Sequence, residues 1–559
     1  MSIKTLPRHA NLEQYRKQAK DLVKLRQSPD TAPRHLERLF KLIQQFHPRY
    51  RKFTAQQIAT QKFALSDAQL VLAREHGFES WPKFAKHIEA AQREASGAPP
   101  DSPEYAFLRS ACTSPGIDHR AGTIEDAEAI LSKHPEIADN SIFVAAVIGN
   151  ADRVQAQLRK AADAETLATT RGGPYGWDAL TSLCFSRYLR ASHEDKSRSR
   201  QFVEIARALL EAGASADTGW FEENDEPVPF WESAIYGAAA VTGHAELTQL
   251  LLDHGADPND EETAYHAAEG YDHAVLKVLL DSGKLNHYSL TTLLLRKGDW
   301  HDQEGMKLVL EAGANPNSAT HWDRTPIQHT LLRDNDIDNI TMQLDHWPKT
   351  DGRVETENVR HGESMAWIAA RRGRRDVLEL LGQRGFPIEL TGAQALIAAC
   401  ARGDRAEATA IAQHDPSALH QLKFGAGILL AEFAGNGNVE GLGILLDLGL
   451  DVGTPNPAGD GYYGIEKYGT ALHTAAWRMQ HEAVRLLLDR GVLVNATDAK
   501  GQTALMLAVK ACVDSYWRRR RKPISIAMLL DAGASTSGIT IPTGYAEADA
   551  LLIQHNVKA

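Results

Sequence analysis

The stretch between residues 469 and 498 most constrains the fold of this chain, because it forms one complete structural unit that cannot be stable alone. Its sequence is GTALHTAAWRMQHEAVRLLLDRGVLVNATD. Thr470 precedes a short helix of small apolar residues, whose free backbone N–H groups its hydroxyl can satisfy. A leucine-rich helix follows and ends at Gly491, where a left-handed terminus favours a residue without a Cβ. Two such helices make only a thin layer, so the unit needs copies of itself on both sides.

Copies of the leucine-rich helix end recur along the chain. They place glycines at 213, 255, 283, 313, 385, 449, 491 and 533. A second glycine, expected between the two helices of a unit, recurs at 149, 243, 373, 403 and 437. The spacing is on the order of 30–40 residues or twice that, which indicates a repeat array.

The TALHTAA start, the LLLDRG end and the following VNATD resemble the ankyrin repeat. The pattern of that family is a turn, T-P-L-H-x-A, two antiparallel helices and a hairpin finger, and Ala471 stands here in place of the proline. The resemblance implies an all-α, ankyrin-type helical solenoid of about twelve repeats. It also implies that His473, which matches the histidine of the family pattern, holds the turn and has a structural role.

The predicted domains follow from composition and helical periodicity. They are a small helical head domain at 1–92, a Gly/Pro/Ser/Ala-rich linker at 93–106, the repeat solenoid at 107–540 and a terminal cap at 541–559. In the head, helices are expected over 6–27, over 33–46, from Ser66 to Glu75 with a Ser66–Gln69 capping box, and from Ser80. The head resembles a helical module that precedes ankyrin arrays in bacterial proteins.

Charge is distributed unevenly. Residues 1–100 contain 18 Lys and Arg against 9 Asp and Glu, whereas the whole chain has a net charge of -11. A basic head could contact a nucleic acid or an acidic partner, or dock on its own acidic body. Its last two helices could form a helix-turn-helix, but the outward side chains Lys83, Lys86 and His87 are not a set that reads bases. Nucleic-acid binding is therefore not favoured.

The chain contains no apolar run near the ~20 residues of a membrane span and no signal-peptide core, so a cytoplasmic location is expected. Cys112, Cys184, Cys400 and Cys512 are isolated, which predicts buried free thiols. No metal-ligand, phosphate-loop or nucleophile-elbow motif is present. We therefore expect no metal and no cofactor.

Three insertions interrupt the repeats, at 190–201, 220–230 and 454–468, and extra loop length on one face is typical of binding. The resemblance also assigns ligand-contact slots to finger tips and to the inner end of the first helix of a repeat. These slots and the insertions hold Trp177, Trp220, Phe221, Trp231, Trp322, Asp323, Arg324, His361, Glu363, Tyr462, Tyr463 and Trp477. Such aromatics either form an exposed surface for a flat apolar ligand face or pack in the core.

Two function classes fit these residues. The favoured one is a non-enzymatic binding module that holds a cytoplasmic protein partner in an aromatic-lined concave groove. The alternative is a carbohydrate-binding or glycoside-hydrolase-like protein, in which tryptophan platforms flank a pair of carboxylates. Its candidate catalytic residues are Glu222, Glu223, Glu232, Asp323 and Glu363.

A run of cations, Arg518 to Lys522, follows Trp517 between the two helices of the last unit. It could contact an acidic partner, a nucleic acid or a membrane surface. It could equally be a solvated insertion, or fold back on the acidic array.

Overall fold

The computed structural model describes residues 12–27, 33–95, 102–113, 122–221, 231–320, 322, 324–347, 363–460 and 464–555. The chain divides into two compact units, Met1–Leu293 (unit 1) and Leu294–Ala559 (unit 2). In the described residues nearly all regular structure is helical, which confirms the all-α fold class; one two-stranded sheet accompanies the helices. None of these helices is long and apolar enough to span a bilayer.

The described residues of the head in unit 1 form five helices. These are α1 (Leu12–Gln27), α2 (Pro33–Phe46), α3 (Ala55–Thr60), α4 (Leu65–Glu75) and α5 (Trp81–Ala95). Leu22, Leu39 and Ile43 form their core. The predicted Ser66–Gln69 capping box is wrong, because α4 begins one residue earlier and the Asp67 carboxylate accepts the backbone N–H of Ala64 at 2.7 Å. The head, linker, solenoid and cap boundaries remain a prediction.

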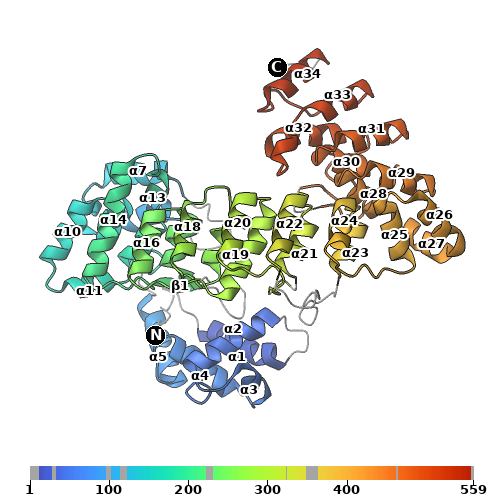
Figure 1. Ribbon diagram of the computed structural model, residues 1–559. Coiled ribbons are helices and arrows are strands. Elements are labelled where there is room, and N and C mark those ends of the chain that lie inside the picture. The colour runs from blue at the N-terminus through green and yellow to red at the C-terminus, as the bar shows by residue number, and fades with distance from the viewer. Residues whose placement is uncertain are drawn as a thin grey trace. The chain divides into compact units, whose positions relative to one another are not determined.

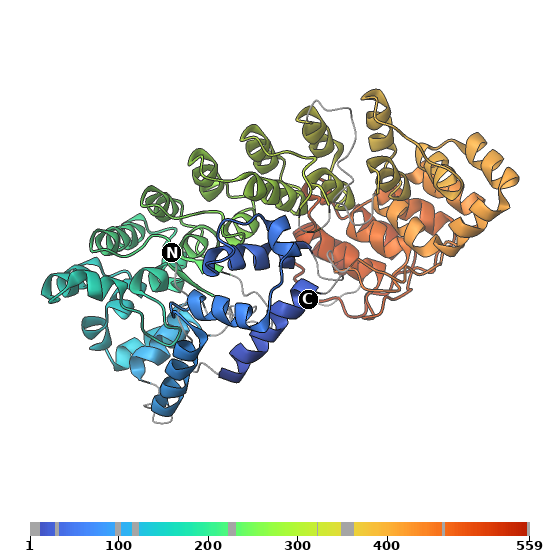
Figure 2. The same ribbon diagram turned by 90° about the horizontal axis from the view of Figure 1, so that it is seen from below.

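The other described residues of unit 1 form mainly helices, many of them in pairs. They are α6 (Pro103–Ala111), α7 (Ile124–Lys133), α8 (Ile137–Asn140), α9 (Ile142–Val147), α10 (Ala151–Lys160), α11 (Ala164–Thr169), α12 (Ala179–Cys184), α13 (Arg187–Ala191), α14 (Lys196–Glu211), α15 (Ala234–Tyr236), α16 (Ala245–Asp253), α17 (Glu262–His266) and α18 (Ala274–Asp281). We call the first helix of each pair inner and the second outer. The outer helices α10, α14, α16 and α18 lie side by side (Figures 1 and 2), as do α9, α12, α15 and α17 on the inner side.

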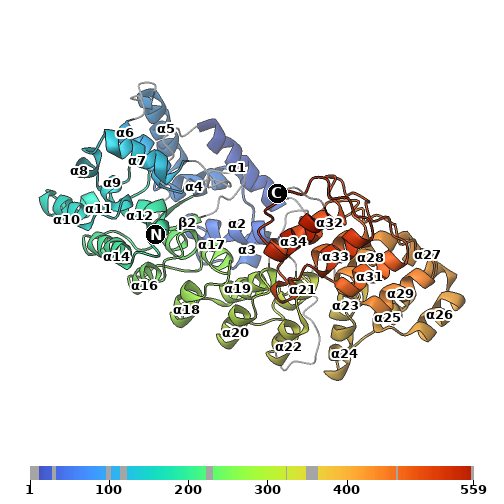
Figure 3. The ribbon, with the colours of Figure 1, turned by 90° about the horizontal axis from the view of Figure 1, so that it is seen from above.

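Helix α19 (His287–Asp299) spans the boundary between the units, and unit 2 continues the same pattern. Its helices are α20 (Gln303–Glu311), α21 (Pro326–Leu332), α22 (Ile337–Asp345), α23 (Met365–Arg371), α24 (Arg375–Gln383), α25 (Ala393–Arg402), α26 (Arg405–His414), α27 (Pro416–Phe424), α28 (Ala426–Gly435), α29 (Val439–Asp447), α30 (Ala471–Trp477), α31 (His481–Asp489), α32 (Ala504–Asp514), α33 (Ile524–Asp531) and α34 (Ala546–Gln554). The outer helices α29, α31 and α33 are neighbours (Figure 3), and the inner helices α28, α30 and α32 pack in the same order. Repeated pairing of this kind builds one continuous apolar core.

Both predicted classes of glycine have left-handed backbone conformations. Gly491 ends the outer helix α31 with φ 77°, and Gly373 separates α23 from α24 with φ 69°. Three residues that are not glycine take this mid-repeat position in unit 2, namely His301, Asp334 and Met479, with φ between 52° and 56°. Residues with a Cβ rarely adopt this backbone conformation, so the surrounding structure must hold these three residues in it.

The insertions have different structures. Residues 196–201 are the first turns of α14, so the predicted insertion at 190–201 is shorter than expected. The second insertion begins in β1 (Gly219–Phe221), which pairs antiparallel with β2 (Trp231–Ser233). The third is closed by a bridge between Asp460 and Ile465. All four cysteines are buried free thiols, as predicted.

Candidate functional site

One position of the repeat carries polar or charged side chains in unit 2. It is the residue that caps the C-terminus of the inner helix, just before the residue with a left-handed backbone. Arg372 caps α23, Asn436 caps α28 and Arg478 caps α30. Asp334 lies in the left-handed position after α21. Because consecutive inner helices pack against one another, side chains at equivalent positions come together.

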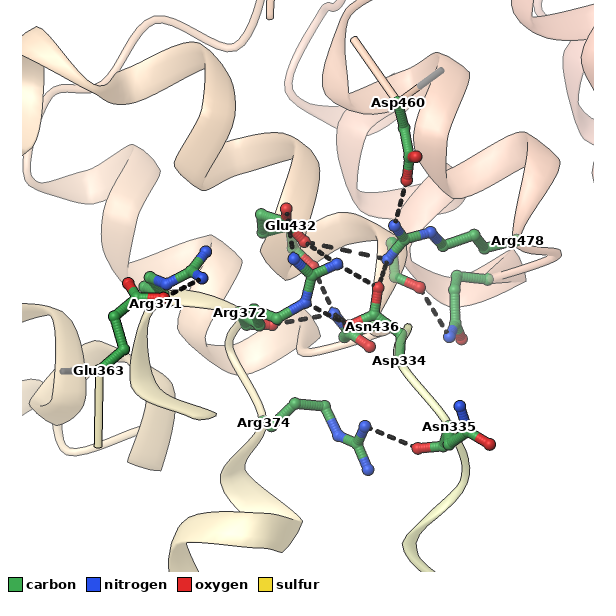
Figure 4. A network of polar contacts seen from close by, with 12 residues as sticks. Asp334, Asn335, Glu363, Arg371, Arg372, Arg374, Glu432, Asn436, Asp460 and Arg478 are labelled. Atoms are coloured by element: carbon green, nitrogen blue, oxygen red, sulfur yellow. Dashed lines mark hydrogen bonds and ion pairs between the residues drawn. The ribbon is translucent and has the colours of Figure 1, made fainter. Parts of the chain in front are cut away.

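Asp334 is the centre of this network, and its side chain is 1% exposed. Its Oδ1 accepts hydrogen bonds from Arg372 Nε at 2.6 Å and from Asn436 Nδ2 at 2.9 Å. Its Oδ2 pairs with Arg372 Nη2 and lies 2.5 Å from Arg478 Nη1. Figure 4 shows the two guanidinium groups on either side of this carboxylate.

Two further carboxylates complete the network nearer to solvent. Glu432 on α28 lies 2.9 Å from Arg372 Nη2, and its side chain is 18% exposed. Asp460 pairs with Arg478 Nη2 at 3.1 Å and is 25% exposed. Three carboxylates thus share two guanidinium groups. Glu432 and Asp460 are more exposed than Asp334.

The electrostatics of the two most buried acids differ. Burial alone would raise the pKa of Asp334, but the charges of Arg372 and Arg478 outweigh it and hold that pKa below its ordinary value. At Glu432 burial dominates, with repulsion from Asp334 added, and the pKa is raised despite the same two arginines. Asp334 is therefore the fixed negative charge of the network.

A neighbouring ion pair extends the polar surface. Arg371 Nη2 lies 3.2 Å from the carboxylate of Glu363, and both side chains are partly exposed. Gln328 Nε2 donates to the Glu363 carbonyl at 2.9 Å and so ties this residue to α21. Figure 4 places the pair beside Arg372, the next residue of the same chain segment.

The basic run after Trp517 folds back onto this network. We call residues 515–522 the return segment; it connects α32 to α33 and includes a 3-10 turn at Arg518–Arg520. The indole Nε1 of Trp517 donates to the Asp334 carbonyl at 3.2 Å, and its ring is 4% exposed. Arg520 Nη2 donates to Asp336 Oδ1 at 2.6 Å. Trp517 and Arg520 fold back onto residues 334–336, whereas Arg518, Arg519 and Lys522 are exposed.

Aromatic rings flank the return segment. The Trp517 ring contacts two guanidinium groups, with centroid distances of 5.4 Å to Arg478 Cζ and 5.9 Å to Arg520 Cζ. The His301 ring meets Trp517 at 5.0 Å and Tyr516 at 6.0 Å. Burial lowers the pKa of His301 to about 4, against the opposing effect of nearby carboxylates. The imidazole is therefore neutral at pH 7.

The exposure expected for two of the aromatic ligand residues is wrong. Trp177, which precedes α12, is 1% exposed, and Trp477 at the end of α30 is 3% exposed. The ring of Trp220, in the finger strand β1, covers Trp177 at a centroid distance of 4.3 Å, and Phe185 packs at 5.3 Å. The competing explanation, core packing, therefore holds for these two indoles, because degenerate repeats fill finger slots with packing residues.

Other predicted site residues lie nearer to solvent. Trp220 and Trp231 in unit 1, and Trp322, Arg324 and Glu363 in unit 2, are partly exposed. Glu232 is buried in β2, and Phe221 lies in β1. Glu222, Glu223, Asp323, His361, Tyr462 and Tyr463 lie outside the described residues. In the part of the chain that the structure describes, no cluster of His, Cys, Asp and Glu could hold a metal ion.

Comparisons with known proteins agree with the repeat architecture. Residues 428–517 match a family described as ankyrin repeats (3 copies), and residues 232–262 match the ankyrin repeat. The first of these segments includes Glu432, Asn436, Asp460, Arg478 and Trp517. No curated protein matches the chain. A crystal structure of the human ASB11 ankyrin repeat domain is 20% identical and covers 49% of this chain and 99% of that chain, with a TM-score of 0.21.

Proposed function

The chain is an ankyrin-repeat protein, and from this premise we propose that it holds a cytoplasmic protein partner against its inner helices without catalysing a reaction. Ankyrin repeats are a protein–protein interaction module. The observation that carries the proposal is the network around Asp334, in which side chains from several repeats fix one another. A partner that meets such a surface orders few side chains on binding, which favours affinity.

The partly exposed members of the site set its chemistry. The carboxylates of Asp460 and Glu363 are 25% and 33% exposed, whereas Glu432 is 18% exposed and its Oε2 is buried. Acidic groups held in place by buried arginines favour a partner with cationic side chains, because complementary charges speed and orient association. We therefore expect the contact region of the partner to be basic.

Aromatic finger residues add an apolar component to the proposal. Trp231 in unit 1 and Trp322 in unit 2 are partly exposed, so part of each indole can contact a protein partner. The buried Trp177 and Trp477 are removed from the proposed contact set. Asp323, His361, Tyr462 and Tyr463 remain candidates by position in the sequence. The saccharide alternative stays a prediction that is less favoured, because two of the five predicted tryptophans, Trp177 and Trp477, are buried, as is Glu232.

Site-specific photocrosslinking tests this proposal. A photoreactive amino acid is placed at Glu363 on the inner side of the repeats, and at Glu379, an exposed residue of the outer helix α24, as the matched control. We expect the inner position to capture one protein that the outer position does not. The variant Trp322→Ala should weaken capture without changing the melting temperature. Equal capture at both positions, or none in the cell lysate, would reject the inner surface as the binding site.

A further inference from the structure

We infer that the inner surface of unit 2 recognises a basic segment that contains a tryptophan, and that the return segment of the chain itself occupies this site. A protein partner with the same chemistry would then have to replace residues 515–522. This inference rests on the proposed function and specifies the kind of partner. It follows from three features: the groups that hold Trp517, the groups that hold Arg520, and the exposure of the return segment.

The groups that bind the indole are held in place by contacts that do not involve Trp517. The carbonyl of Asp334 accepts the indole N–H at 3.2 Å, and it belongs to a loop in a left-handed conformation. The loop is fixed from elsewhere, because Arg374 Nη1 donates to the Asn335 carbonyl at 2.7 Å and Asn335 Nδ2 donates to the Gly298 carbonyl at 2.8 Å. The guanidinium of Arg478, itself paired with Asp334, supplies a cationic face for the ring.

The site for the arginine lies next to the indole site. Asp336 accepts Arg520 at 2.6 Å, and its side chain is about half exposed. Asp336 precedes α22 but does not cap it with a side-chain hydrogen bond, so its carboxylate is available for this ion pair. Trp517 and Arg520 are thus bound by Asp334 and Asp336, which belong to the same loop. Tryptophan and arginine are the side chains that dominate binding energy at protein interfaces.

The return segment combines one anchor in the apolar core of unit 2, the ring of Trp517, with cations that lie outside that core. Among its cations, Arg518, Arg519 and Lys522 are exposed, and its only regular structure is a single 3-10 turn. Its polar contacts with residues 334–336 are the indole hydrogen bond of Trp517 and the ion pair of Arg520. Arg519 also contacts Gln303 at 3.4 Å, and Tyr545 donates to the Arg521 carbonyl at 3.3 Å. Arg521 instead bonds to the Ser515 carbonyl, which closes the segment on itself. A competitor therefore has to replace the buried ring of Trp517 and the ion pair of Arg520.

Tethering explains why the site is closed in the free protein. A segment joined to its site by short connections acts at an effective concentration on the order of mM. A competing peptide of modest affinity cannot displace it at micromolar concentration. When the two anchors of the return segment are removed, the same peptide should bind in trans.

The test uses the full chain and a fluorescent synthetic peptide with the sequence of residues 514–522, DSYWRRRRK. The opened protein carries Trp517→Ala together with Arg520→Ala. We expect it to bind the peptide at least about tenfold more tightly than the wild-type chain does. A scrambled peptide of the same composition should bind more weakly, because the spacing between tryptophan and arginine is lost.

Variants of the site itself complete the test. In the opened protein, Asp336→Asn should weaken peptide binding about tenfold, whereas Asp338→Asn, an exposed acid on the first turn of the same helix, should leave it unchanged. Equal binding to wild-type and opened protein, equal binding of the scrambled peptide, or insensitivity to Asp336→Asn would overturn the inference. If circular dichroism shows that the double variant unfolds, Arg520→Ala alone opens one anchor, and the same differences are expected. Partner capture at Glu363 with no peptide binding would reject this inference while the proposed function stands.

Discussion

The guanidinium of Arg478 lies 2.5 Å from the carboxylate of Asp334, although the two residues belong to repeats that are not neighbours in the sequence. Arg372 and Glu432 come from the repeats between them and link the two. Arg372 pairs with both Asp334 and Glu432, and Glu432 lies 3.9 Å from Arg478. The inner surface of unit 2 is therefore stabilised by polar contacts that pass over several repeats. In a simple repeat array each unit contacts only its neighbours.

Removal of Arg478 should destabilise unit 2 strongly. The variant Arg478→Ala leaves the buried carboxylate of Asp334 with one guanidinium instead of two and opens a gap beside Trp517. Breaking a buried pair by removing one partner costs about 3–5 kcal/mol, because an uncompensated charge stays in the interior. Urea denaturation followed by circular dichroism measures the loss in the free energy of unfolding.

Arg485→Ala is the matched control for this prediction. Arg485 lies on the next helix, α31, and forms an exposed ion pair with Glu482 at 3.5 Å. Exposed pairs of this kind contribute about 0–1 kcal/mol. If Arg478→Ala were no more harmful than Arg485→Ala, the network would not contribute to stability and its role would be recognition alone.

The sequence was sufficient to predict the fold because each repeat carries its own signals. The glycines at 373, 403 and 437 mark the turn between paired helices, and the structure confirms their left-handed backbone. Arg478 could be assigned to the inner end of its helix from the TALHTAA pattern alone. The same register places Arg372 and Asn436 directly before Gly373 and Gly437. These two network residues could therefore have been found by alignment of the repeats.

Other parts of the site could not be predicted in this way. Asp334 replaces the glycine that marks the register, so its repeat has no signal at that position. The contact of Trp517 with the Asp334 carbonyl depends on how far the repeats turn between α21 and α32, which no local pattern encodes. The exposure of the tryptophans could not be predicted from the local sequence either. Trp177, for example, is covered by Trp220, which belongs to a later finger.

The buried tryptophans should behave as core residues. Trp177→Ala and Trp477→Ala each remove a large ring that is almost fully buried, and such truncations cost about 3–5 kcal/mol. Trp322→Ala, at a partly exposed finger position, should cost less than about 1 kcal/mol. Thermal unfolding of the three variants checks the difference. A melting temperature unchanged by Trp177→Ala would mean that its ring is not packed as described.

The two classes of left-handed glycine should differ in their tolerance of alanine. At Gly491 a Cβ would meet no atom within 4 Å, so Gly491→Ala should cost only the backbone penalty of about 1–2 kcal/mol. At Gly373 a Cβ would lie 2.8 Å from two ring atoms of Phe433. Gly373→Ala should therefore cost about 1–3 kcal/mol more than Gly491→Ala. Equal losses in urea denaturation would show that Phe433 moves aside freely.

Acid should weaken unit 2 through His301. Burial holds the pKa of this histidine at about 4, below its ordinary value of 6.5, although the carboxylates of Asp336 and Asp334 oppose the shift and Arg520 and Arg478 add to it. Between these two values the unfolded chain binds a proton that the folded chain does not, so the free energy of unfolding falls as pH is lowered from 6.5 towards 4. One such proton contributes a slope of at most about 1.4 kcal/mol per pH unit.

The variant His301→Asn isolates this effect, because asparagine tolerates the left-handed backbone of this position and does not titrate. Urea denaturation at several pH values between 4 and 6.5 should give a shallower slope for His301→Asn than for the wild-type chain. His346→Asn, at an exposed position that follows α22, should keep the wild-type slope.

Because the His301 ring packs against Tyr516 and Trp517, its protonation should also release the return segment. Hydrogen exchange at residues 515–522 should then accelerate below pH 5 in the wild-type chain but not in His301→Asn.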